Sequence, residues 1–132
     1  SKFKYFGNGP MDSYRDMTHH GITAWHESDA DREYVNYIRP QEHGNHYGCR
    51  ELEIENSLKF SAEDLMEISV LHHSIEQLTK AEHTDELKKS DGTHIRIDYK
   101  VSGIGALCSG PALPEKYQLK EKDILFKFKI TV

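Results

Sequence analysis

Residues 37–52 read YIRPQEHGNHYGCREL and bring together side chains that metal sites, catalytic centres and sugar-binding rims all use. His43 and His46 are close enough in sequence to converge on a metal ion, and Glu42 beside them is a candidate general acid or base. The amide and acid groups of this stretch also suit a sugar-binding rim. Three kinds of chemistry are therefore open at this corner, and the rest of the chain has to decide among them.

The nine histidines include two adjacent pairs, His19-His20 and His72-His73. Adjacent side chains on a strand point to opposite faces, so neither pair can chelate one ion from regular β structure. The pair formed by His43 and His46 supplies only two ligands, whereas a zinc site needs a third and a fourth. We therefore expect this chain to hold no metal ion.

A thiol nucleophile needs a histidine base and an orienting acid beside it. Cys49 stands at the start of an alternating segment and is expected to be a small, packed side chain. Cys108 lies in a predicted loop, and no particular histidine is indicated as its base. Glycosidase carboxylates must be held about 5 to 10 Å apart across a pocket. Acidic runs such as EDLME and ESDADRE are more typical of a solvent-exposed face. We assign no catalytic residue.

Alternation of apolar and polar residues with a period of two dominates the chain and predicts strands. In RELEIEN, for example, Leu52 and Ile54 share one face and three glutamates occupy the other. The apolar members of six such runs are Phe3 and Tyr5; Leu52 and Ile54; Leu58 and Phe60; Met66, Ile68 and Val70; Ile95, Ile97, Tyr99 and Val101; and Phe126, Phe128, Ile130 and Val132. The pattern predicts an all-β fold, an antiparallel β-sandwich.

Three local signals interrupt this pattern. Ser74 followed by Gln77 forms a capping box and predicts one short helix near 75–83. The Asp91-Gly92 pair predicts a turn before a strand that starts near His94. YFGNGP, residues 5–10, reads as a strand followed by a turn, because its two glycines can take positive φ and its proline ends strand pairing.

The stretch GIGALCSGPALPEK, residues 103–116, has three glycines and two prolines and is predicted to be an irregular loop of the kind that carries binding residues. Aromatic side chains gather in the first third of the chain. They suit either the apolar face of a sugar or an interface with another domain. These aromatic residues are Tyr14, Trp25, Tyr34, Tyr37 and Tyr47.

The bulk composition narrows the classes of function. A chain of 132 residues predicts a single domain spanning 1–132, and a net charge of -5 from 17 basic and 22 acidic side chains argues against a nucleic-acid partner. No apolar stretch is long enough to cross a membrane, and two cysteines without a disulfide framework favour a cytoplasmic setting. The opening SKFKYF, which lacks Met, indicates a piece of a longer polypeptide.

Four segments in order carry a specific resemblance. They are YFGNGPMDSYRDM, EYVNYIRPQEHGNHYGCREL, HSIEQLTKAEHTDEL and IRIDYKVSGIGALCSGPALPEKYQL. Together they cover nearly the whole chain, and they resemble the C-terminal, small-chain domain of the LacZ-type β-galactosidases of glycoside hydrolase family 2. The resemblance implies a β-supersandwich related to galactose mutarotase folds, of which this chain is about the C-terminal half.

The same resemblance implies that the two catalytic glutamates lie in a preceding barrel domain, so that this chain acts as a non-catalytic part that shapes the galactoside pocket. It places Ser109, or Cys108 in a shifted register, at the pocket wall, although the sequence has no Trp there and its Cys and Ser stand in swapped order. It implies no cofactor here, since the family uses Mg²⁺ and Na⁺ in other domains. The expected partners are the preceding domains or a large subunit, the galactoside, and a further copy of the chain in a homo-oligomer.

Two other interpretations stay open. One is a free-standing sugar-binding or mutarotase-like module, in which His43, His46 and Glu42 are the acid and base group. The other is a structural oligomerisation domain. Under the leading interpretation the corner at 37–52 is structural. Arg39-Pro40 fixes an extended turn, Gly44 permits the chain reversal, and three polar side chains can bond to neighbouring backbone, namely Gln41, Glu42 and Asn45.

Overall fold

The computed structural model describes residues 1–15, 18, 21–34, 43–80, 89, 91–100 and 123–132. In chain order the elements are β1 (Lys2–Gly9), β2 (Ile22–Asp29), β3 (His46–Ile54), β4 (Lys59–Leu71), α1 (Ile75–Lys80), β5 (His94–Asp98) and β6 (Phe128–Thr131). Strands dominate, and the single short helix is the only helical element of the described chain. The predicted all-β fold class is confirmed, and the arrangement is consistent with an antiparallel β-sandwich.

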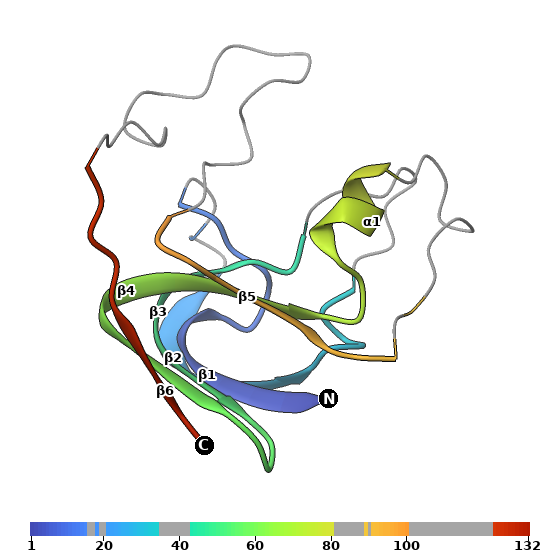
Figure 1. Ribbon diagram of the computed structural model, residues 1–132, viewed down its shortest axis with the longest axis horizontal. Helices are drawn as coiled ribbons and strands as arrows, with labels where there is room; N and C mark the ends of the chain where they lie inside the picture. The colour runs from blue at the N-terminus through green and yellow to red at the C-terminus, as the bar shows by residue number, and fades with distance from the viewer. Residues whose placement is uncertain (16–17, 19–20, 35–42, 81–88, 90, 101–122) are drawn as a thin grey trace.

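The strands form a six-stranded sheet in the order β2-β1-β3-β4-β5, with β6 also paired to β4. Every pairing is antiparallel. The long strand β4 curves through the structure, as Figure 1 shows: its first residues, 59–62, pair with β6, and its last residues, 67–71, pair with β5. The curvature of this strand turns one face of the sheet inward on itself.

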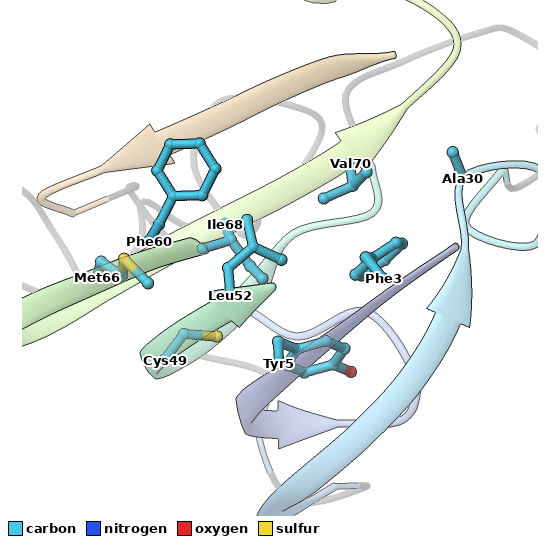
Figure 2. Packing of buried hydrophobic residues seen from close by; sticks show 9 residues of the cluster. All are labelled: Phe3, Tyr5, Ala30, Cys49, Leu52, Phe60, Met66, Ile68 and Val70. Carbon is cyan, nitrogen blue, oxygen red and sulfur yellow. The ribbon is translucent and has the colours of Figure 1, made fainter. Parts of the chain in front are cut away.

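That inward face holds the apolar core (Figure 2). Leu52, Met66 and Ile68 are completely buried there, and period-two alternation places them together because each points from its strand to the same face. The other members of the cluster are Phe3, Tyr5, Ala30, Cys49, Phe60 and Val70. The core is thus built by the residues that the alternation predicted, with Cys49 packed among them.

The strands differ from the sequence-based expectation in two places. Phe60 of the first run and the run Met66–Val70 belong to one strand, β4, and the alternation lapses at 61–65, where four of the five side chains are exposed. Strand β2 was not predicted. Its inward side chains include His26 and Ser28, which lie opposite Tyr5 and Phe3. Because these inward side chains are polar, the segment lacks the apolar alternation by which the other strands were predicted.

Gly7 and Gly9 do not adopt the positive φ that glycine allows. Both lie in β1, and the positive-φ glycines of the described residues are Gly44 and Gly48. At Gly7 the requirement is close approach, because a Cβ there would lie 2.3 Å from the Sγ of Cys49. The motif therefore uses glycine to bring β1 against β3, not to turn the chain.

Helix α1 begins as its capping box predicts. The Ser74 backbone N–H donates to Gln77 Oε1 at 3.0 Å, and the Gln77 N–H donates to Ser74 Oγ at 3.2 Å. The helix is described to Lys80, and residues 81–83 of the predicted range lie outside the described residues. Strand β5 begins at His94, as the turn signal predicted. In the described part of the chain, no helix has the length and hydropathy to cross a membrane.

The edge formed by β6 differs from the rest of the inward face. Phe128 and Ile130 pair with Ala62 and Phe60 of β4, so they continue the core face, yet they are 41% and 54% exposed. Phe126 stacks beside Phe128 with ring centroids 5.3 Å apart. The inward face therefore ends in apolar side chains that the described residues do not cover.

Candidate functional site: a buried polar junction

One end of the sheet gathers the described residues from which three loops depart. Strand β1 ends there at Gly9, β3 begins there at His46, and β5 ends there at Asp98, since antiparallel pairing sets these ends at one level. The backbone N–H of Ser13 donates to the carbonyl of Asn45 at 2.6 Å and ties the first two segments together. Three of the four sequence motifs thus converge on one small region.

The side chain of Asn45 lies at the centre of this region and is completely buried. Its amide nitrogen donates to the Ser13 carbonyl at 2.9 Å and to Glu67 Oε1 at 2.9 Å. Its amide oxygen accepts from Arg96 Nη2 at 3.2 Å. One amide therefore bonds to the loop after β1, to β4 and to β5, and both of its N–H groups are used.

Charges of both signs surround this amide. Glu67 is 2% exposed, and its second carboxylate oxygen lies 3.9 Å from Arg15 Nη2. Arg96 also pairs with Asp98 through an Nε–Oδ2 contact of 2.7 Å. Two cations and two anions thus balance around Asn45, which is what a buried ionic group requires. We call Ser13, Arg15, Asn45, Glu67 and Arg96 the Asn45 junction.

Ser13 extends the junction to the start of β3. Its hydroxyl accepts from the Tyr47 N–H at 2.9 Å and donates to the carbonyl of Asn8 at 3.3 Å. The side chain of Asn8 in turn packs against Gly21, where a Cβ would lie 2.5 Å from Asn8 Oδ1. The loop after β1 is therefore fixed at both of its described ends.

The chain enters the junction through Gly44, which has φ of 74°. This left-handed conformation costs a side-chain-bearing residue about 1 kcal/mol or more, so glycine suits the reversal that the sequence predicted. The adjacent His43 is 2% exposed and meets the ring of Tyr34 edge-on at 5.3 Å. Asn45 does bond to backbone, but to the carbonyl of Ser13, 32 residues away, and not to its neighbours within the corner. Residues 35–42 of the corner lie outside the described residues.

A second buried polar group lies next to the junction, on the β1–β2 side. His46 Nε2 donates to Glu33 Oε2 at 2.6 Å, and Ser28 Oγ donates to the other oxygen of the same carboxylate. His46 is completely buried and stacks on Tyr5 at 4.3 Å. We call Tyr5, Ser28, Glu33 and His46 the Glu33 cluster. His43 and His46, the proposed acid and base of a mutarotase-like site, therefore both face the interior.

Burial sets the chemistry of the two remaining titratable groups in this part of the core. It raises the pKa of the Tyr5 phenol far above its usual value, and the nearby Glu33 carboxylate adds to the effect. Burial also raises the pKa of the Cys49 thiol, with a further contribution from Glu67. A thiol held neutral in this way is a poor nucleophile, so Cys49 is a packing residue, as the sequence predicted.

An open groove of about 780 Å³ lies at the opposite end of the sheet, near the start of β1 and the β3–β4 turn. A hydrogen bond from Lys4 lowers the pKa of the Glu53 carboxyl. The backbone N–H of Asp31 lowers that of Asp29, and a hydrogen bond from Lys89 lowers that of Asp31. A glycosidase acid needs a raised pKa, so these three carboxyls are tuned in the opposite direction.

One group of potential metal ligands occurs among the described residues. Oxygen atoms of Asp29 and Asp31 and a ring nitrogen of His72 lie within 4.8 Å of one another. Lys89 Nζ already lies 2.6 Å from Asp31, which is 58% exposed, so a cationic side chain neutralises this group from within the chain. Neither His43 nor His46 belongs to it.

The structure and the sequence prediction of the site overlap only in part. Asn45 was predicted to be a structural hydrogen-bonding residue and is one, whereas Ser109, Cys108 and Glu42 lie outside the described residues. The sequence analysis missed Glu67 and Arg96. A signal was available for Glu67, because an acid inside the apolar run MEISVL must find a buried partner.

Comparison with known proteins gives a consistent result. A family described as beta galactosidase small chain matches residues 1–130. The beta-galactosidase of Actinobacillus pleuropneumoniae is 38% identical over 95% of this chain, which corresponds to 12% of that protein. Those of Staphylococcus xylosus and Kluyveromyces lactis are 34% and 31% identical, each over 96% of this chain and 13% and 12% of their own lengths. The chain thus spans about an eighth of the curated relatives it matches.

Proposed function

Because the chain belongs to the β-galactosidase small-chain family, we propose that it is a non-catalytic part of a larger β-galactosidase, in which it shapes the galactoside pocket and supports assembly. On this proposal the parent protein hydrolyses terminal β-D-galactosides such as lactose. The observation that carries the proposal is a family match over residues 1–130 by a chain that spans only 12% of its relative. The bond-breaking carboxylates then belong to the rest of the polypeptide.

The state of the described carboxylates supports a non-catalytic role. Glu33 and Glu67 are buried and engaged by His46, Ser28 and Asn45, so neither oxygen pair faces a substrate. The described carboxyls with shifted pKa values are shifted downward by neighbouring donors, as at Glu53. A retaining or inverting glycosidase needs one carboxyl kept protonated near neutral pH, opposite a second that is ionised.

The part of the chain that reaches the pocket is, on this proposal, the loop 103–111 with Ser109 or Cys108 at its tip. These residues lie outside the described structure, and the support comes from the resemblance of GIGALCSGP to the family loop. The Asn45 junction adds physical support, because β5 and Arg96 tie the described residues before this loop to two other motif segments. A small side chain contributes little to galactose affinity, about 1 kcal/mol or less.

The test uses the full-length protein with Ser109→Trp and, as a matched control, Cys49→Ser. A ring placed beside a sugar contributes ~1 to 3 kcal/mol, so Ser109→Trp should change the KM for a chromogenic galactoside or the ratio of hydrolysis to transfer. Cys49→Ser should lower stability and leave both unchanged, because Cys49 is buried in the core. The isolated chain should show no turnover. Turnover by the isolated chain, or unchanged kinetics in both Ser109→Trp and Cys108→Trp, would contradict the proposal.

A further inference from the structure

We propose that Asn45 is a positioning residue: its side chain fixes the segment after β1 relative to strands β4 and β5, and through them the galactoside pocket of the parent enzyme. The inference rests on the proposed function for its substrate. It adds a residue that touches no sugar yet controls how the sugar is bound. The geometry of one amide and the segments it joins carries the argument.

Asn45 is bonded to segments that are far apart in sequence. Its partners Ser13, Glu67 and Arg96 lie 32, 22 and 51 residues away from it. The Ser13 carbonyl belongs to the segment after β1, Glu67 lies inside β4, and Arg96 lies in the middle of β5. A shift of any one segment therefore breaks a hydrogen bond at the same side chain.

The directions of these bonds allow one arrangement only. The two N–H groups of an amide diverge at a fixed angle and its oxygen points the other way, so the Ser13 carbonyl, Glu67 and Arg96 must each lie in its own direction. Asn45 is completely buried, so a lost partner cannot be replaced by bulk water. Glu67 is 2% exposed and shares this constraint. The junction is thus rigid by geometry and by desolvation together.

This role goes beyond holding the sheet together. The apolar core cluster contains none of the junction residues, and strands β3 and β4 pair through their own backbone. Asn45 instead immediately precedes β3, and Ser13 and Arg15 follow β1, so these three residues lie outside the strands, whereas Glu67 and Arg96 lie inside β4 and β5. The junction thus holds two segments outside the sheet against two of its strands. A defect here should therefore displace those two segments before it unfolds strands.

The experiment compares Asn45→Asp, Asn45→Ala and Leu52→Ala in the full-length protein. Leu52 is a completely buried core residue outside the junction and serves as the control for lost stability. Thermal unfolding of each variant sets a working temperature at which all are folded. At that temperature kcat, KM and the hydrolysis-to-transfer ratio are measured with a nitrophenyl β-galactoside.

The expected result separates placement from stability. Misplacing a positioning group by about 1 Å lowers a rate by up to ~100-fold, so both Asn45 variants should lower kcat/KM roughly tenfold or more, mainly through KM. Leu52→Ala should lower the unfolding temperature and leave KM and the ratio unchanged. If the Asn45 variants and Leu52→Ala change KM equally, or not at all, Asn45 is only a stabilising residue and the inference is overturned.

A charge-swapped rescue sharpens the test. Asn45→Asp places a second carboxylate beside Glu67. Adding Glu67→Gln restores a pair of one amide and one carboxylate, in which the residue at 67 donates the hydrogen bond and the residue at 45 accepts it. The double variant should have a lower KM than Asn45→Asp alone, and a KM that is no lower contradicts the inference. Ser109→Trp, measured in parallel, separates the two ideas. If Ser109→Trp alters the kinetics and the Asn45 series does not, only the positioning role fails; if Ser109→Trp and Cys108→Trp have no effect, the proposed function fails.

Discussion

The loop end and the β6 edge of the curved sheet differ in the side chains that they bury and expose. At the loop end, polar side chains are buried: Asn45 and Glu67 are at most 2% exposed, and their partners lie within the chain. At the β6 edge, apolar side chains are exposed, with Ile130 at 54% and Val132 fully in solvent. At the first end Asn45 and Glu67 are hydrogen-bonded within the described chain, whereas the second end exposes the kind of surface that proteins usually cover.

The difference shows what each end contributes. A buried polar network stabilises a unique arrangement because each donor needs its acceptor in one direction. A buried donor or acceptor that loses its partner lowers the free energy of unfolding. An apolar strip is non-directional, so any apolar surface of suitable shape stabilises it. The loop end is therefore suited to fix the relative positions of chain segments, and the β6 edge is suited to bind another apolar surface. The following substitutions test this contrast.

The largest effect is expected from a carboxylate introduced at the loop end. Asn45→Asp removes both amide donors and places a second buried acid against Glu67, so we expect a loss of about 3 kcal/mol or more in the free energy of unfolding. Ile130→Asp introduces the same group at the exposed β6 edge and should cost far less. Urea unfolding followed by the fluorescence of Trp25, the one tryptophan of the chain, measures both. Equal losses at the two positions would remove the contrast.

The sequence predicted the apolar end better than the polar one. Alternation located the inward residues of β1, β3, β4 and β5, because a strand that buries apolar side chains carries a period of two. It failed at β2, where the inward His26 and Ser28 are polar. It also failed to join the two halves of β4, because the mostly exposed residues 61–65 interrupt the pattern.

At the junction, the sequence indicated single residues but not their partners. Asn45 and Gly44 were predicted from local turn chemistry, which depends on near neighbours. The bonds to Glu67 and Arg96 join residues 22 and 51 positions apart, and such pairs depend on strand order and register, which single-sequence patterns do not specify. Tertiary contacts of this kind therefore become visible only in the folded chain.

The second prediction concerns association at the β6 edge. The isolated chain should self-associate through Phe128 and Ile130, because burying one such side chain contributes ~1 to 2 kcal/mol. Ile130→Asp should weaken association by roughly tenfold or more. The matched control is Thr131→Asp, which puts the same charge one residue along, on the other face of the strand. Light scattering at micromolar concentration measures both; a monomeric parent chain, or equal effects of the two variants, counts against the prediction.

The smallest effect is expected at Tyr5, where the Glu33 cluster meets the apolar core. Its hydroxyl is buried and has no hydrogen-bond partner among the described residues, so removing it with Tyr5→Phe should leave the free energy of unfolding unchanged or raise it by up to ~1 kcal/mol at neutral pH. A loss of that size would show that the hydroxyl is hydrogen-bonded after all.

The same substitution has a pH signature whose sign follows from burial. Burial raises the pKa of Tyr5 and of Cys49 above their usual values of 10.0 and 9.0, so the unfolded chain releases these protons at a lower pH than the folded chain does. Their contribution to stability is therefore complete below about pH 9 and is lost as the pH rises beyond it. Tyr5→Phe should flatten the decline above pH 10 by up to ~1.4 kcal/mol per pH unit and leave the earlier decline, which belongs to Cys49. Urea unfolding between pH 7 and pH 11 measures both slopes, and an unchanged decline above pH 10 would mean that the phenol ionises as readily in the folded chain as in the unfolded one.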